Sequence, residues 1–328
     1  MKTNAYREYL RGHGLDDEKI EERIPVILAF EDWLSKRGME IASADQADVG
    51  DYAKHLIAVG ENTLRNYYTL CNYAMWLGLR ALYVQLVEVT DCHNGMETLR
   101  DIIETRHGAE IRDQIFREPI PPLGADEAER FAYTQTISGR MDEYLTPKEI
   151  HAAWFQVQHG MPKEFWQKHD DEQRQKYAAC ESLEEFVDRM VEERHALLTR
   201  LHAENELWFT QEVTDEALDY LLEHPHLQLG EHNGRKGILV TKVPYQTARS
   251  LRETDKTLKR YYACHCPLVR EAILKGKKLS GDSCYCSLGH ASHYLTGMGL
   301  EHLEGEVLES VVRGDDRCRF IFYLPENA

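Results

Sequence analysis

Apolar residues recur at helical spacing through the first 80 residues of the chain. One such run spans residues 20–34, a second begins near residue 48, and a third spans residues 63–77. A glycine follows the first and the third run, as is common where a helix ends in a left-handed residue. The pattern predicts a bundle of helices over residues 1–80.

Helical periodicity continues beyond residue 80 and breaks at Pro119-Ile120-Pro121-Pro122-Leu123-Gly124, the strongest linker signal in the chain. We therefore predict a helical connector over residues 81–124 and a second domain over residues 125–328. Residues 126–206 of that domain still follow a helical pattern.

After Asn205 the spacing changes to short β-like runs. Residues 238–244 form one predicted strand, and residues 306–325 form a predicted hairpin around Gly314-Asp315-Asp316. The predicted fold class is α + α/β: an N-terminal helical bundle, then a mixed α/β ligand-binding domain that ends in a β-hairpin.

Composition narrows the setting of the protein. Hydrophobic residues make up 42% of the chain, and no apolar run approaches the roughly 18 residues of a membrane span. Residues 1–5 lack the apolar core of a signal peptide. We therefore expect a cytoplasmic protein with no membrane partner, and disulfides are uncommon in the cytoplasm.

The net charge of −17 is unevenly distributed, with −18 over residues 81–234 and +4 over residues 235–328. The acidic middle argues against a surface that wraps nucleic acid. The basic C-terminal segment is compatible with an anionic small ligand, although the asymmetry could also serve solubility alone. Self-association into a homo-oligomer is left open.

Four of the eight cysteines lie in two closely spaced pairs, Cys264-His265-Cys266 and Cys284-Tyr285-Cys286. The pairs suit a metal site, a redox site or two disulfides, and the expected compartment weakens the disulfide interpretation. Two thiols at this spacing face the same way only on extended backbone, which Pro267 favours for Cys266. Four thiolates suffice for tetrahedral zinc, so we predict zinc at Cys264, Cys266, Cys284 and Cys286, with Cys318 and Glu309 as alternative ligands.

Catalysis is the alternative role for the same thiols. Pro267 and Ser287 are predicted near helix starts, and a helix N-terminus favours thiolate over thiol. Cys286 is then the candidate nucleophile, with His265 or His290 as the base. His265, His290 and His293 could instead be zinc ligands. His290 and His293 could also be solvent-facing or packed histidines, and Cys318 could be a plain core cysteine.

The C-terminal region also offers residues suited to a small ligand. Arg270 and Lys242 are candidate partners for an anion. Aromatic side chains that could line a pocket are Tyr261, Tyr262, Phe320 and Phe322.

The N-terminal string, from Phe30-Glu31-Asp32-Trp33-Leu34 to Tyr73-Ala74-Met75-Trp76-Leu77-Gly78, resembles the core-binding, SAM-like domain of tyrosine recombinases. The resemblance implies DNA association. The recombinase catalytic residues and the basic DNA face have no counterpart here, so a bundle used for protein contacts is the competing interpretation.

The segments Cys284-Tyr285-Cys286-Ser287-Leu288-Gly289 and Gly314-Asp315-Asp316-Arg317-Cys318-Arg319-Phe320 resemble the closing part of the 4-vinyl-reductase domain. They are also similar to the L-2-amino-thiazoline-4-carboxylic acid hydrolase family. The run Tyr261-Tyr262-Ala263-Cys264-His265-Cys266-Pro267-Leu268-Val269-Arg270-Glu271 most resembles a related uncharacterised bacterial family. The resemblance implies an α/β small-molecule-binding module.

In the sensor branch of that group, zinc is held by a cysteine before a glycine turn, a glutamate and two cysteines near the last hairpin. By this resemblance Cys284 or Cys286 takes the first position, Glu309 the second and Cys318 the last. The remaining position falls near Ser310, which is not a cysteine. The pair Cys264 and Cys266 could supply the missing thiolates.

Together these features predict a cytoplasmic bacterial small-molecule-binding protein with a cysteine-rich zinc site. The first alternative is a hydrolase of a small heterocyclic or C–N/C–S compound, acting through zinc-bound water or a cysteine thiolate. The second alternative is a DNA-associated protein that acts through its N-terminal domain.

Overall fold

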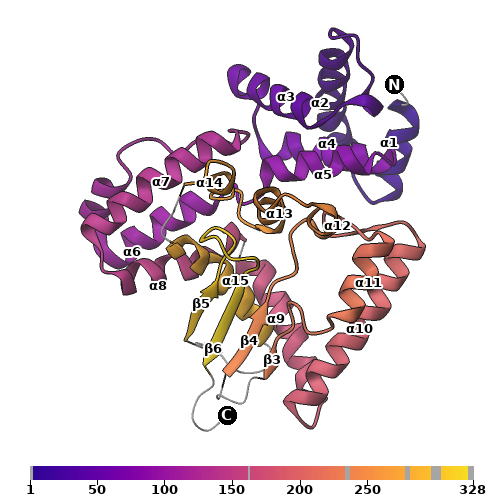
Figure 1. The fold of residues 1–328 in the computed structure, drawn as a ribbon. Coiled ribbons are helices and arrows are strands. Elements are labelled where there is room, and N and C mark those ends of the chain that lie inside the picture. Colours follow the sequence, from indigo (N-terminus) through magenta and orange to yellow (C-terminus); the bar gives the residue numbers. More distant parts are fainter. Residues whose placement is uncertain (1–2, 162, 233–236, 278–280, 297–303, 324–328) are drawn as a thin grey trace. The chain divides into compact units, whose positions relative to one another are not determined.

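The computed structural model describes residues 3–161, 163–232, 237–277, 281–296 and 304–323. The chain forms two compact units that interleave along the sequence (Figure 1). The first contains Met1–His93 and Pro121–Asp126, and the second contains Asn94–Ile120 and Glu127–Ala328. The α + α/β prediction is confirmed, because the first unit is helical and the second combines helices with small antiparallel sheets.

The first unit is built by helices whose ends carry strong local signals. Asp45 and Asp48 form a capping box at the start of one helix, and Thr63 caps the next by accepting from the Asn66 backbone N–H. Phe30 and Tyr67 are fully enclosed in the core between them. The helices are α1 (Thr3–Gly12), α2 (Asp17–Ser35), η1 (Ile41–Ser43), α3 (Gln46–Val59), α4 (Leu64–Trp76) and α5 (Arg80–Thr90).

The proline-rich segment predicted as a linker belongs to this unit. Leu123 accepts a hydrogen bond from the Asn62 side chain at 3.0 Å. Gly124 adopts a left-handed φ of +93°, and a Cβ there would lie 2.4 Å from the Tyr67 hydroxyl. The predicted connector, residues 81–124, is therefore divided between the units: α5 packs in the first, and the helix after it opens the second.

The second unit begins with long helices and continues with short elements. Its helices are α6 (Gly95–Ile115), α7 (Glu127–Tyr144), α8 (Pro147–Val157), η2 (Gln158–Gly160), α9 (Lys163–Ala178), α10 (Leu183–Ala203), α11 (Asp215–Glu223), α12 (Thr247–Arg252), α13 (Lys256–Ala263), α14 (Glu271–Leu274), η3 (Gly281–Cys284) and α15 (Tyr285–Thr296). Its strands are β1 (Leu207–Trp208), β2 (Gln211–Glu212), β3 (Glu231–His232), β4 (Gly237–Thr241), β5 (Gly305–Glu309) and β6 (Arg319–Tyr323).

Strands β3, β4, β6 and β5, in that order, form one antiparallel sheet. Helix α15 lies beside this sheet (Figure 1). Phe320 and Phe322, two residues apart on β6 and so on one face of the sheet, belong to a core that includes Leu288 and Leu295 of α15. The predicted C-terminal hairpin is confirmed as β5 and β6, with strands shorter than expected. Strand alternation also predicts Leu324 on the same face as Phe320 and Phe322, but Leu324 lies outside the described residues.

Helices α8 and α15 cross at very close range because one residue of α15 has no side chain. A Cβ on Gly289 would lie 1.8 Å from the carbonyl oxygen of Phe155 in α8. Only glycine therefore permits this crossing, which fixes the first turn of α15 against the C-terminal end of α8.

Three predicted helix boundaries are wrong in this region. The sequence pattern predicts one helix over residues 251–262, but the segment holds two, α12 and α13, because Asp255 caps a new start. Residues 267–270 form a turn, so the helix expected at Pro267 begins at α14 instead. Ser287, expected as a helix cap, lies inside α15.

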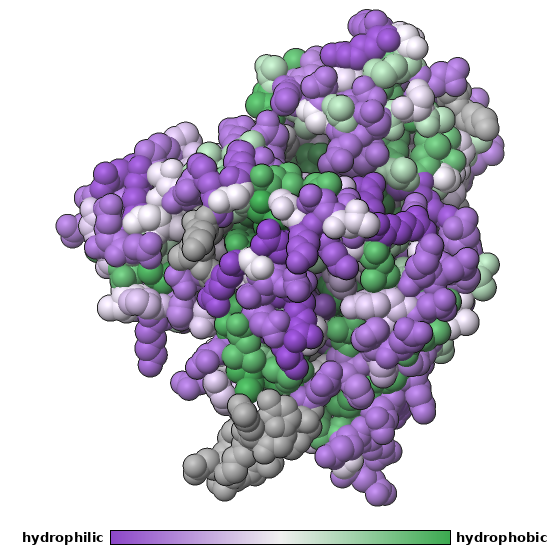
Figure 2. All heavy atoms as spheres, viewed as in Figure 1, coloured by the Kyte–Doolittle hydropathy of each residue, from purple (hydrophilic) through white to green (hydrophobic). Residues whose placement is uncertain are grey.

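Over the described residues, no helix is both long and apolar enough to cross a membrane. Figure 2 shows a face dominated by hydrophilic residues, on which apolar residues form separate patches. Scattered exposed apolar side chains of this kind are normal for a folded surface.

Candidate thiol-rich site

The first cysteine pair follows α13, and the backbone of its first member, Cys264, is extended. Cys264 ends α13 with φ −76° and ψ 127°, and both Cys264 and Cys266 are buried. The intervening His265 ring donates from Nε2 to the carbonyl of Val243, 2.6 Å away. That hydrogen bond ties the pair to the segment that follows β4.

The second pair lies on helical backbone, contrary to the geometry that two thiolates on one metal would need. Cys284 ends η3 and Cys286 belongs to the first turn of α15, so their side chains diverge. The Cys284 thiol lies 3.0 Å from the Ser310 hydroxyl. The Cys286 thiol instead accepts the backbone N–H of His159 at 3.1 Å.

Ser310 connects the second pair to Cys318. Its side chain is completely buried and its hydroxyl contacts both the Cys284 and the Cys318 thiol. The Cys318 carbonyl in turn accepts the backbone N–H of Lys242 at 2.9 Å. A serine therefore stands between two thiols at the position where the resemblance places a cysteine ligand.

Lys242 provides positive charge inside this group of thiols. The residue is only 5% exposed, and it interacts electrostatically with Cys318, Cys286, Cys264 and Cys266. Burial lowers the pKa of its ammonium group, while the neighbouring thiols act to raise it. We call Cys264, Cys266, Cys284, Cys286 and Cys318, with Lys242, the thiol cluster.

The thiols of the cluster are poor acids in this environment. Burial raises the pKa of Cys284 to about 12 and raises the pKa values of Cys264 and Cys318 as well. Neighbouring thiols add to the effect on Cys264 and Cys284, because each thiolate would repel the next. All eight cysteines are free of disulfides. Without a cation these three thiols stay neutral near pH 7.

His159 is a member of the site that sequence reasoning missed. Both Gln158 and His159 have left-handed backbone, with φ of 48° and 59°. This conformation is costly for residues other than glycine, and such strain concentrates at functional sites. It brings the His159 ring within 3.2 Å of the Ser287 hydroxyl. No spacing motif in the sequence links residue 159 to a segment about 130 residues later.

The imidazoles of this region are neutral. Burial, followed by the charge of Lys242, lowers the pKa of His159 to about 3 and also lowers the pKa values of His265 and His290. The rings of His159 and His290 meet edge to face at 4.9 Å. His293 is placed apart from the thiols, stacked on Trp166.

The donor chemistry of the thiol cluster fits a thiophilic ion, but the side chains are not arranged around one point. Among the described residues, no three His, Cys, Asp or Glu side chains are placed to hold a metal ion together. The divergence of Cys284 and Cys286 is one physical reason. Glu309 is engaged elsewhere, in ion pairs with Arg317 at 2.9 Å and Arg319 at 3.5 Å.

The residues predicted to bind an anion have protein partners. Arg270 is buried and forms an ion pair with Glu127, whose carboxylate also accepts from the Tyr261 hydroxyl at 3.0 Å. Lys242 faces the thiols, and Phe320 is fully enclosed beneath α15. Arg270 thus belongs to a buried ion pair, Lys242 to the thiol cluster and Phe320 to the core. Their role in binding a ligand stays a prediction.

Comparison with known proteins gives no family assignment: no family model, no curated protein and no solved structure matches this chain.

Proposed function

We propose that the second unit is a small-molecule-binding domain whose thiol cluster binds a thiophilic metal ion, Zn²⁺ being the best fit to the donors. One observation carries this proposal. Buried and half-buried cysteines from three separate segments interact electrostatically with one buried lysine, although cysteines used only as core residues have no reason to gather.

Electrostatics supports a cation at this position. Cys264, Cys284 and Cys318 interact with one another, and burial keeps all three protonated. A divalent ion would allow these thiols to ionise, and Lys242 would offset the remaining negative charge. Cys264, Cys284 and Cys318 would therefore hold the ion, with Cys266 and Cys286 as further donors. The diverging side chains would have to change rotamer to do so.

Metal analysis of protein purified without a histidine tag tests the proposal. We expect about one zinc per chain, as a tetrahedral thiolate site requires. The double variant Cys264→Ser, Cys284→Ser should lose it. Cys71→Ser is the matched control, because Cys71 is a buried cysteine of the first unit. Metal-free protein with all its thiols open to titration would refute the zinc site.

A second candidate function, thiol-dependent hydrolysis of a small heterocyclic or C–N/C–S compound, is favoured by the contact to Cys286. The backbone N–H that reaches its sulfur comes from the strained His159, and a donated hydrogen bond stabilises a thiolate. His159 then joins His265 and His290 as a candidate base. Cys286 is only 1% exposed, so a substrate would need a path to it.

Alkylation of the same protein samples separates the two functions. A closed metal site protects its thiols, whereas a catalytic cysteine reacts fast. Rapid and selective labelling of Cys286 by iodoacetamide in metal-loaded protein would favour the hydrolase. Uniform protection, released by a chelator, would favour the metal site.

A further inference from the structure

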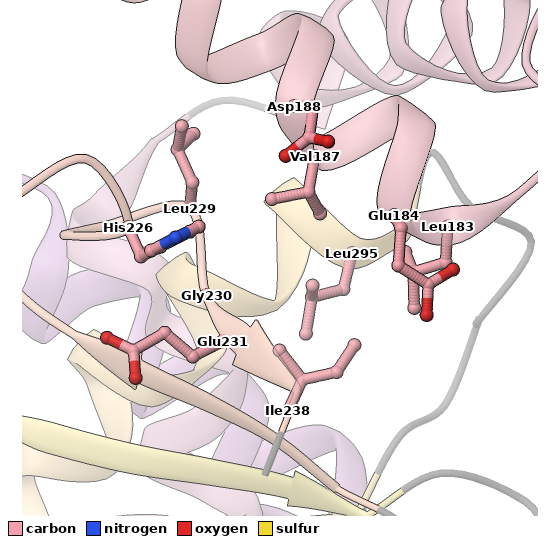
Figure 3. Close-up of a pocket in the computed structure, with 10 residues that line it drawn as sticks. All are labelled: Leu183, Glu184, Val187, Asp188, His226, Leu229, Gly230, Glu231, Ile238 and Leu295. Atoms are coloured by element: carbon pink, nitrogen blue, oxygen red, sulfur yellow. The ribbon is translucent and has the colours of Figure 1, made fainter.

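A solvent-accessible pocket that no residue of the thiol cluster lines is formed between α10, the turn before β3, strand β4 and α15 (Figure 3). Its volume is about 340 Å³, within the range that small ligands occupy. Val187, Ile238 and Leu295 converge at its centre. Ile238 and Leu295 are almost fully buried members of the core, so the floor of the pocket is apolar and well packed.

The wall of the pocket is shaped by a glycine. Gly230 has a left-handed φ of +97°, and a Cβ there would lie 2.7 Å from a methyl group of Ile238. The turn can therefore pass close to β4 only with glycine at this position. The close approach places Glu231, the first residue of β3, at the rim.

Three carboxylates surround the apolar floor: Glu184 and Asp188 from α10 and Glu231 from β3 (Figure 3). Over the described residues, neither Glu184 nor Asp188 has a basic partner. Arg317 interacts with Glu231 but is itself ion-paired with Glu309. Besides the imidazole of His226, the rim thus carries three carboxylates, of which Glu184 and Asp188 have no ion-pair partner among the described residues.

The arrangement of these charges is unfavourable without a ligand. Glu184 and Asp188 are four residues apart on one helix, where like charges repel and destabilise the helix. The partial positive charge at the helix N-terminus favours Glu184 in the first turn more than Asp188 in the second. A cation between α10 and β3 would relieve both the repulsion on α10 and the charge of Glu231.

We propose that this pocket binds a small molecule with an apolar body and a primary or substituted ammonium head. The apolar floor suits the body, and the three carboxylates of the rim suit the head. A bare metal ion would leave the apolar floor without a partner, whereas an amine with an apolar body contacts both the floor and the rim. The inference rests on the small-molecule-binding role proposed above, to which it gives a location and a cationic ligand class, whereas the sequence suggested an anion.

Matched probes test the ligand class on the full chain. Binding of 2-phenylethylamine, 2-phenylethanol and 3-phenylpropanoate would be measured by calorimetry and by ligand-observed NMR at low salt. We expect the amine to bind about 10-fold more tightly than the alcohol, and the carboxylate to show no binding. Equal affinity for amine and alcohol, or no binding of the amine, would overturn the proposal.

Substitutions test the location. The triple variant Glu184→Gln, Asp188→Asn, Glu231→Gln should reduce amine affinity about 10-fold and leave alcohol binding unchanged. Val187→Phe should fill the pocket and abolish binding of both probes. Glu192→Gln is the matched control, because Glu192 is an exposed acid of the same helix outside the pocket. An equal loss in the control, or unaltered amine affinity in the triple variant, would contradict the assignment.

Zinc content measured on the same samples keeps the two proposals separate. The triple variant should retain the metal content of the parent protein, since none of its substitutions touches the thiol cluster. Amine binding by a protein that holds no zinc would support the amine pocket and refute the zinc site. Zinc in a protein that does not bind the amine would support the zinc site and refute the amine pocket.

Discussion

His159 illustrates how a single residue can matter through its backbone and its ring at once. The backbone of His159 is left-handed, and its N–H donates a hydrogen bond to the Cys286 thiol, while its ring contacts the Ser287 hydroxyl. Burial holds the pKa of the ring at about 3, compared with 6.5 when exposed. Between these two pH values the unfolded chain takes up a proton that the folded protein does not accept.

This difference predicts a loss of stability in mild acid. The free energy of unfolding should fall as pH drops below 6.5, by up to about 1.4 kcal/mol per pH unit for His159 alone. His159→Asn should remove that contribution, because asparagine tolerates left-handed backbone but does not titrate. Urea unfolding between pH 7 and pH 4 measures it. His224→Gln is the control, an exposed histidine of the same unit, and an unchanged slope in His159→Asn would count against the assignment.

At the scale of elements, the crossing of α8 and α15 determines where the second cysteine pair lies. Gly289 brings the helices together, so the first turn of α15 meets η2 and the thiol of Cys286 meets His159. The sequence shows Gly289 but not what lies opposite it.

Gly289→Ala should therefore be strongly destabilising. A methyl group 1.8 Å from the Phe155 carbonyl must push the two helices apart, which we expect to cost about 3 kcal/mol or more. Gly139→Ala is the control. It lies in α7 with open space around its Cβ position, so alanine should stabilise the helix by about 0.5–1 kcal/mol. Thermal melts compare the two, and equal behaviour would contradict the predicted close contact.

The elements that sequence reasoning found are those governed by local signals. The helices of the first unit follow from apolar spacing and from caps such as Thr63, and the hairpin of β5 and β6 follows from alternation around a turn. The predicted start of α15 is wrong because serine is a common helix cap, which places the start after Ser287, whereas the helix begins at Tyr285, directly after η3. The spacing of the cysteine pairs was enough to propose a shared site for Cys264, Cys266, Cys284 and Cys286. His159 and the acidic pocket could not be predicted in this way, because residues far apart in the sequence form them.

At the scale of the whole molecule, the first unit is larger than the helical domain predicted over residues 1–80, because it also contains α5 and residues 121–126. Leu82 and Leu86 of α5 are buried in its core. Removing two buried leucines costs about 2–5 kcal/mol each, which is comparable to the whole stability of a small domain.

We therefore expect a fragment of residues 1–93 to melt cooperatively and a fragment of residues 1–80 to be largely unfolded at 25 °C. Circular dichroism of both fragments, at equal concentration, is the measurement. Cooperative melting of the shorter fragment at the same temperature would show that α5 is dispensable.

Residues 121–126 belong to the first unit although they follow α6 of the second unit in the sequence. This order has a consequence for synthesis on the ribosome. The chain is made from the N-terminus, so Gly124 and its contact with Tyr67 become available only after all of α6 has emerged. Residues 1–93 therefore form their helical core first, and residues 121–126 join it only when α6, the opening helix of the second unit, is already made. Assembly of the two units is coupled in time as well as in covalent structure.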